Sequence, residues 1–231
     1  MNAVLALFRS SIGRKIVMAV TGFALFGFVV AHMAGNLQAF LGPSRLDEYG
    51  AALRRLPALL WAMRLGLLGA AILHVWAAAS LTRDNWAARP QRYRSRRWQD
   101  SDYASRSMRL TGVVLLAFIV YHVMHFTLGN VHPDFIEGGV NHNLVVGLRV
   151  LPVLAFYLLA QVCLGFHLWH GAWSMTQTLG LAHPRYDVLR RRLSLAFTLI
   201  VVLGFVAVPI GVFTGVIEQA PAIAAAAREA R

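Results

Sequence analysis

The sequence predicts an all-α membrane protein, a bundle of five transmembrane helices. Hydrophobic residues make up 58% of the 231 residues, and charged residues only 14%, whereas soluble domains carry about 25% charged residues. The apolar residues gather in five blocks, each close to the length of about 20 residues that a helix needs to cross a bilayer. The formal net charge of +12 does not indicate nucleic-acid binding, because the arginines lie between the apolar blocks.

The five predicted spans are residues 16–40, 57–81, 110–129, 150–175 and 193–217, and each is bounded by Arg, Pro, Gly or Asn. The first apolar block exceeds the roughly 7–15 residues of a signal-peptide core, so we expect it to be a retained helix. Residues 1–217 are therefore predicted to form one transmembrane domain, and the alanine-rich segment 218–231 a flexible C-terminal tail. No internal repeat is evident from inspection.

The basic residues alternate between the connections and so predict an orientation. Three precede the first span, eight lie in residues 82–109 and four in residues 183–192. The first connection offsets its three arginines with two acids, and the third holds one arginine beside two acids. The positive-inside rule places the N-terminus in the cytoplasm and the C-terminus outside. No connection is long enough to fold as a domain, so substrate chemistry outside the membrane would belong to partner subunits. The single cysteine, Cys163, excludes a disulfide within the chain.

Histidines are the feature of the spans that most needs explanation. His132, His142 and His183 lie in connections and are expected to be solvated. The other six lie in four of the five spans: His32, His74, His122, His125, His167 and His170. One membrane histidine is often only a hydrogen-bonded interhelical contact. The spans hold no Asp or Glu at their centres, which disfavours a proton relay or a hard-cation site. Imidazoles on facing helices are instead typical ligands of haem iron.

Depth in the membrane sorts these histidines into two layers. Measured from the cytoplasmic end at 1.5 Å per residue, His32 lies about 24 Å deep and His122 about 18 Å. His74 lies about 10 Å deep and His167 about 12 Å by the same rise. The depths predict two bis-histidine haem sites, His32 with His122 toward the outside and His74 with His167 toward the cytoplasm. They cannot choose between His122 and His125, or between His167 and His170, because residues three apart on a helix face similar directions.

Several segments together resemble a known family: SSIGRKIVMAVTG, AHMAGNLQAF, LHVW, LTG followed by YHVMHF, and FHLWHGAWSMTQTLG. In their order and spacing the chain resembles the di-haem cytochrome b membrane-anchor subunit of succinate dehydrogenase and fumarate reductase, the single-chain type with five helices, over about residues 8–215. The resemblance implies that His32, His74, His122 and His167 are the axial iron ligands, with the pairing given above. His170 would then be an additional donor near the haem or simply a packed side chain.

The resemblance also implies a function, partners and a location. Two haems b would pass electrons between membrane quinone, expected to be menaquinone, and a flavoprotein and an iron–sulfur subunit on the cytoplasmic side. The chain would be a multi-pass protein of the cell inner (cytoplasmic) membrane, held in the lipid bilayer and not catalytic on its own.

Two other kinds of protein share part of this pattern. One is a di-haem cytochrome b anchor of a hydrogenase or formate dehydrogenase, which the co-purifying soluble subunits would distinguish. The other is a haem-free protein, a transporter or a structural anchor, which haem content would distinguish. The lack of intramembrane carboxylates and of evident repeated halves weighs against a transporter.

Overall fold

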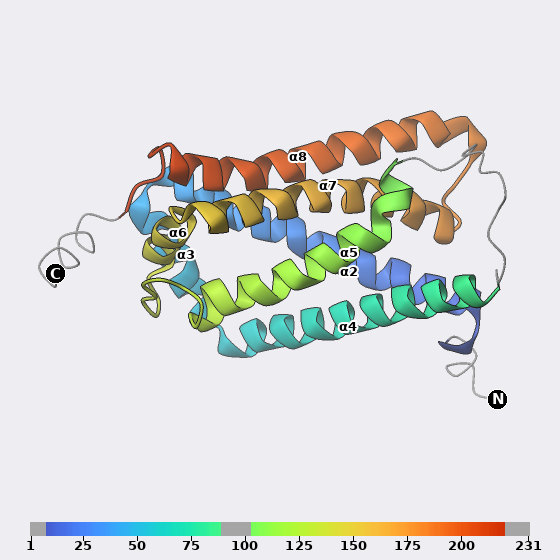
Figure 1. The fold of residues 1–231 in the computed structure, drawn as a ribbon, viewed down its shortest axis with the longest axis horizontal. Coiled ribbons are helices and arrows are strands. Elements are labelled where there is room, and N and C mark those ends of the chain that lie inside the picture. The colour runs from blue at the N-terminus through green and yellow to red at the C-terminus, as the bar shows by residue number, and fades with distance from the viewer. Residues whose placement is uncertain (1–7, 89–102, 220–231) are drawn as a thin grey trace, which may run out of the picture.

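A computed structural model describes residues 8–88 and 103–219 of the chain. Throughout these residues the regular structure is helical, which confirms the predicted fold class (Figure 1). Five helical segments are long and apolar enough to cross a membrane. The helices are α2 (Ser11–Leu37), α3 (Pro43–Arg54), α4 (Pro57–Ala87), α5 (Tyr103–Val123), α6 (Val140–Leu148), α7 (Leu151–Thr178) and α8 (Asp187–Phe213), with short turns η1 (Gln38–Leu41), η2 (Met124–Leu128) and η3 (Pro184–Tyr186).

Several ends of the long helices extend beyond the predicted apolar blocks, whereas α8 ends at Phe213 rather than at residue 217. The α2 helix begins at a Ser10 cap, whose hydroxyl accepts a hydrogen bond from the Gly13 amide at 2.9 Å. The α4 helix continues to Ala87 rather than to residue 81, and α8 starts at Asp187 rather than at 193. Polar and charged residues favour helix as readily as apolar ones do, so hydropathy marks the membrane core and not the helix end. The predicted boundary between domain and tail at residue 217 stays a prediction, and residues 220–231 lie outside the described part.

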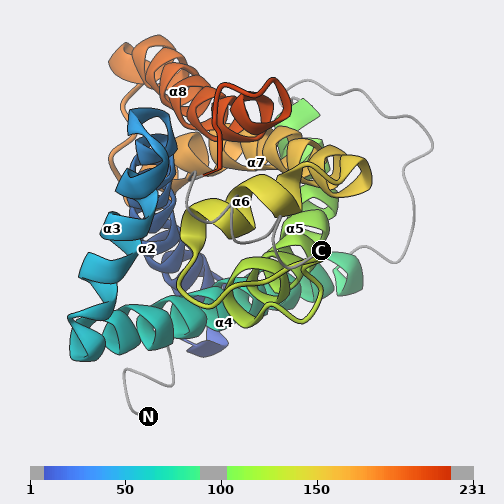
Figure 2. The same cartoon turned by 90° about the vertical axis from the view of Figure 1, so that its left-hand side faces the viewer.

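The five long helices alternate in direction and form two hairpins and a fifth helix (Figure 1). The α2 helix packs against α4, and α5 packs against α7. The α8 helix packs against α7 and α2, while α3 and α6 lie together at one end of the bundle (Figure 2). We call these two short helices the cap, and this end of the bundle the capped end. A buried apolar cluster sits at this capped end and is made of Ala39, Leu46, Leu144, Val145, Leu148, Tyr157, Val208, Val212 and Ile217.

The short helix α6 lies inside the capped end, and its burial contradicts the expectation that His142 is solvated. His142 is almost fully buried, with its Nε2 3.0 Å from the Asp134 carbonyl, so the prediction that it is solvated was wrong. Sequence inspection treated this connection as a surface loop, whereas nearly every residue of α6 is buried. Its polar groups find partners in neighbouring segments; Asp47 of α3, for example, accepts a hydrogen bond from the Asn141 amide at 2.8 Å.

The other two connection histidines differ from each other in environment. His132 is half-buried and its Nε2 donates to the Asn143 carbonyl at 2.8 Å, so it too is more enclosed than predicted. His183 is exposed, as expected, and its ring accepts a hydrogen bond from the Arg185 amide at 3.2 Å. The difference follows from the fold, because His132 lies under the helical cap and His183 in the short link before α8.

An ion pair joins the first hairpin at the end opposite the cap, and we predict that it contributes to stability. Arg14 on α2 pairs with Asp84 on α4, and the arginine side chain is only 11% exposed. Asp84→Asn should lower the free energy of unfolding by about 1–2 kcal/mol, between the values for exposed and buried pairs. Thermal unfolding in detergent measures this. Glu48→Gln, in the exposed pair Arg45–Glu48, is the matched control. Equal melting temperatures for both variants would contradict the prediction.

Candidate functional site

The structure brings the four predicted ligand histidines together as two ring pairs. The ring centroids of His32 on α2 and His122 on α5 lie 5.8 Å apart, with the ring planes 85° to each other. Those of His74 on α4 and His167 on α7 lie 6.3 Å apart at 58°. These are the pairs that the membrane depths indicate. We call them the outer pair and the inner pair, the latter lying toward the predicted cytoplasmic side.

The geometry also separates the two members of each histidine doublet. His122 faces His32, whereas His125 lies in the π-helical turn η2, is 0% exposed, and stacks on His132 with centroids 4.8 Å apart. His167 faces His74, whereas its neighbour His170 lines a separate pocket. Only the first histidine of each doublet is therefore placed opposite a histidine of another helix within the described residues.

The spacing of each pair suits one metal ion between two imidazoles. Ligand nitrogens about 2 Å from a shared metal lie about 4 Å apart, which places the ring centroids about 6 Å apart. The described residues contain no cluster of three or more His, Cys, Asp or Glu side chains that would hold a bare metal ion. Two-ligand sites suit haem iron, whose remaining positions are filled by the porphyrin. The residues present therefore fit haem better than a bare ion.

The helices that carry each pair are diagonal to one another in the bundle. Close backbone packing joins α2 to α4 and α5 to α7. Within the described ranges, neither α2 with α5 nor α4 with α7 is among the helix pairs that pack closely along their length. The paired rings therefore meet across the bundle from helices whose backbones stay apart. This is the arrangement expected where side chains of facing helices build a cofactor site in the bundle interior.

In the inner pair, both imidazoles are held through Nδ1. The Nδ1 of His74 lies 3.1 Å from the Met18 carbonyl oxygen and 3.2 Å from the Thr21 hydroxyl. The Nδ1 of His167 lies 3.4 Å from the Thr111 hydroxyl. Hydrogen bonding at one ring nitrogen of a metal-binding histidine fixes the tautomer and leaves the other nitrogen for the metal. In both residues, Nε2 is thus the nitrogen left for a metal.

In the outer pair, one tyrosine contacts two histidines. The Tyr157 hydroxyl on α7 lies 3.2 Å from Nδ1 of His122 and 3.0 Å from Nδ1 of His125. If Nδ1 of His122 donates to the Tyr157 oxygen, Nε2 of His122 is left for a metal. The His125 Nε2 is buried and has no hydrogen-bond partner among the described residues. Its ring lies close to Gly147 of α6, at the capped end of the bundle.

The structure reveals an internal repeat that inspection of the sequence missed. Residues 18–32 and 108–122 both read M-x-x-T-G-x9-H, with the shared residues Met18/Met108, Thr21/Thr111, Gly22/Gly112 and His32/His122. The partner helix of each hairpin then carries H-x-W, at residues 74–76 and 167–169. The hairpins α2–α4 and α5–α7 therefore carry the same motif in the same order, and the lack of repeated halves no longer weighs against a transporter. A comparison of the two segments at fixed offset would have found Thr21 and Thr111 before the structure did.

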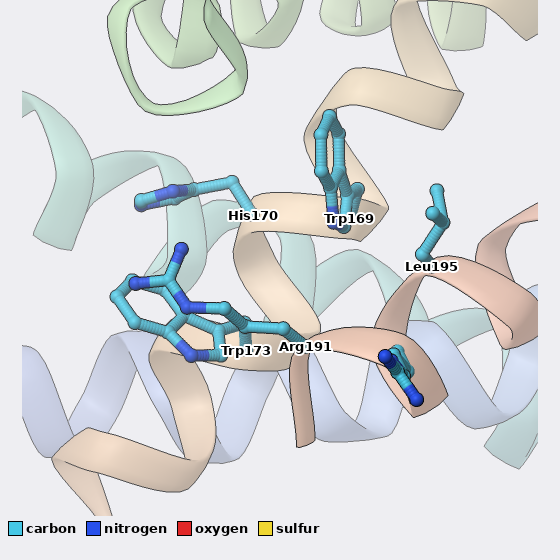
Figure 3. A pocket seen from close by; sticks show the side chains of 6 residues that line it. Trp169, His170, Trp173, Arg191 and Leu195 are labelled. Carbon is cyan, nitrogen blue, oxygen red and sulfur yellow. The ribbon is translucent and has the colours of Figure 1, made fainter. Parts of the chain in front are cut away.

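A pocket of about 150 Å³ lies between α7 and α8 on the inner-pair side of the bundle (Figure 3). The Arg191 guanidinium lies 4.4 Å from the ring centroid of Trp173, and Figure 3 shows this stacking. The neighbouring Arg190 instead turns inward and bonds to Thr176 and Asp187. The pocket is lined by Trp169, His170, Trp173, Arg191, Arg192 and Leu195. Its cationic and aromatic side chains are typical of the membrane–water interface.

These features define a class of protein: a multi-pass helical membrane protein with histidine pairs inside the bundle. Comparison with known families makes the assignment more specific. The family model of the succinate dehydrogenase/fumarate reductase transmembrane subunit matches residues 82–208, more than half of the chain, and the protein belongs to this family. The match contains the second hairpin, with His122 and His167, and most of α8. Searches of curated proteins and of solved structures gave no significant match.

Proposed function

We propose that this chain is the cytochrome b membrane subunit of a succinate dehydrogenase or fumarate reductase complex. It anchors the flavoprotein and iron–sulfur subunits to the cell inner (cytoplasmic) membrane. Through two bis-histidine haems b it passes electrons between those subunits and membrane quinone. Menaquinone is the quinone we expect. Family membership supports the first part of this proposal, and the histidine pairs support the second.

The haem assignment rests on how the four imidazoles are hydrogen-bonded and on how they face one another. Three of the four proposed ligands have Nδ1 within hydrogen-bond distance of a protein oxygen. All four rings face a second histidine at the spacing of a shared metal ion. If these four histidines served only to fill space, their rings would not be expected to face one another in pairs across four separate helices. Haem b, when bound, supplies a one-electron couple at each pair.

The two pairs are stacked along the direction in which the helices cross the membrane. On α2, Thr21 lies beside His74 of the inner pair, and His32 of the outer pair follows it on the same helix. At 1.5 Å per residue, the two levels are about 16 Å apart along this helix. The chain thus holds two redox sites at different depths. Electron movement between them would couple to the membrane potential at about 2.3 kcal/mol per charge per 100 mV.

The end of the bundle at the inner pair is the side we propose for the soluble subunits. Arg191 and Arg192, at the start of α8, are exposed there and contribute positive charge that would attract acidic partners, although Arg191 also lies 3.6 Å from Asp187 of the same helix. The arginine-rich stretch of the second connection is predicted to serve the same purpose, but most of it lies outside the described residues. These positive charges also orient the chain, with this end in the cytoplasm, by the positive-inside rule.

The proposal is tested by purifying the full chain from membranes together with whatever subunits accompany it. A reduced-minus-oxidised optical spectrum, with haem quantified against protein, should give two low-spin b-type haems per chain. A flavoprotein and an iron–sulfur subunit should co-purify, and the complex should exchange electrons with a quinone analogue. A folded chain without haem would overturn the cofactor assignment. Haem together with hydrogenase or formate dehydrogenase subunits would overturn the assignment of the complex.

A further inference from the structure

We propose that Thr21 and Thr111 are positioning residues that set the tautomer and ring orientation of the inner-pair histidines. Each threonine lies on one helix of a hairpin and holds the histidine of the partner helix through Nδ1. This leaves the Nε2 lone pair of His74 and of His167 for iron. The inference rests on the proposed function, because it takes these two histidines to be haem ligands.

The hydrogen bonds around Thr21 show which ring nitrogen of His74 carries the proton. The Thr21 hydroxyl donates to the Val17 carbonyl of its own helix at 2.7 Å, so its oxygen is left as an acceptor. The Met18 carbonyl, 3.1 Å from the His74 Nδ1, can only accept. The proton of this contact must therefore sit on Nδ1, from which it is shared between Met18 and Thr21. With Nδ1 protonated, Nε2 of the neutral ring carries the free lone pair.

The same arrangement recurs in the second hairpin. The Thr111 hydroxyl is directed at the carbonyls of Ser107 and Met108, at 3.1 and 3.2 Å, and so presents its oxygen as an acceptor to Nδ1 of His167. Both threonines are buried, with exposures of 8% for Thr21 and 4% for Thr111, so water does not compete for these bonds. Within the part of the chain that the structure describes, the Thr111 hydroxyl is the one hydrogen-bond partner of the His167 ring.

The glycine that follows each threonine leaves space for the imidazole ring of the partner histidine. A Cβ at Gly22 would lie 3.2 Å from Cε1 of His74, and one at Gly112 would lie 3.7 Å from Cε1 of His167. In each Thr-Gly dipeptide, the threonine hydroxyl thus contacts Nδ1, and the glycine, which has no side chain, leaves space for the edge of the ring. Among residues 8–88 and 103–219, threonine is within hydrogen-bond distance of a histidine ring at the inner pair alone. In the outer pair, the Tyr157 hydroxyl is shared between His122 and His125.

Thr111→Val removes the hydroxyl at nearly constant shape and tests the inference in the purified complex. A hydrogen bond from Nδ1–H makes a histidine ligand more basic and favours ferric iron, so its loss should raise the midpoint potential of the inner haem. Tenfold weaker binding of the ferric relative to the ferrous form corresponds to a shift of about +59 mV for one electron. The ferric low-spin EPR signal of this haem should change as its ligand ring rotates. The outer haem should keep its potential and signal.

Thr21→Val should give a smaller shift in the same direction, because the Met18 carbonyl still accepts from His74. Thr111→Ser is the rescue variant, since it restores the hydroxyl and should return the potential of the inner haem to the wild-type value. The inner haem is identified independently as the one that is lost from a His74→Ala chain. These variants separate positioning from general destabilisation, which would affect both haems and would not be rescued by serine.

The outcomes distinguish this inference from the proposed function. If the wild-type chain holds no haem, the proposed function fails and the inference fails with it. If the wild type holds two haems and Thr111→Val leaves both potentials and EPR signals unchanged, the proposed function stands and the positioning role is wrong. A shift confined to the outer haem would also overturn the inference.

Discussion

Replacing His167 with alanine is expected to lower the haem content from two to one per chain. The inner pair would lose one of its two iron ligands, because His167 faces His74, whereas His170 lines the pocket between α7 and α8. The remaining haem should keep its low-spin spectrum, since the outer pair draws on α2 and α5 rather than on α7. Haem quantification against protein, together with the optical spectrum, measures the result.

His170→Ala is the matched control for this experiment. His170 lies three residues from His167 on the same helix, yet it lines the pocket between α7 and α8 rather than facing His74. The control variant should therefore retain two haems. The reverse result, in which His170→Ala loses a haem and His167→Ala does not, would show that the other histidine of the doublet is the ligand.

The doublet on α5 allows a parallel test in the outer pair. His122→Ala should remove the outer haem and leave the inner one. His125→Gln keeps a hydrogen-bonding group beside Tyr157 in a fully buried position, and should retain both haems. Loss of the outer haem from His125→Gln alone, in a chain that melts like the wild type, would move the ligand assignment to His125.

Gly147→Ala is expected to destabilise the capped end of the bundle. A Cβ there would lie 2.7 Å from Cε1 of His125 and 2.8 Å from Nε2 of His132. Both are stiff rings stacked on each other under α6, so neither can move aside easily. Overpacking of this kind typically costs about 1–3 kcal/mol. The melting temperature in detergent should fall, and the outer haem should be perturbed before the inner one.

Gly66→Ala serves as the control for the cap substitution. Gly66 lies within α4, and a Cβ there would meet nothing within 4 Å. Alanine also has a higher helix propensity than glycine, so this variant should melt at or slightly above the wild-type temperature. If Gly147→Ala melts like Gly66→Ala, the close packing of α6 on His125 and His132 is not part of the stable structure.

The number of spans and the pairing of histidines between helices were easier to predict from the sequence than the structure of the short connections. Apolar block length gave five spans, because only helices of that length satisfy their backbone groups in lipid. Helical rise gave the depths at which histidines of different helices meet, because rise per residue is nearly constant. Helix α6 was not predicted, since nine residues carry too little pattern to reveal burial. For the same reason, the burial of His142 came only from the structure.

The residues that hold the ligands were harder to predict than the ligands themselves. A histidine in an apolar block is conspicuous because it is costly there. Thr21, Thr111 and Tyr157 are not, because threonine and tyrosine occur in membrane helices for many reasons. Their roles depend on which ring nitrogen faces which oxygen, and this is a property of interhelical geometry. Only the repetition of the Thr-Gly pair at a fixed distance before a histidine carried a sequence signal.

The repeat also changes how the origin of the two redox sites can be understood. Each pair takes the same position from both hairpins: His32 matches His122, and His74 matches His167. Such pairing of matching positions is what an approximate twofold axis along the membrane normal would produce. A single hairpin that dimerised with its own copy about that axis would already offer two symmetric imidazole pairs. Duplication and fusion of such a hairpin would then leave each copy free to diverge without loss of either site.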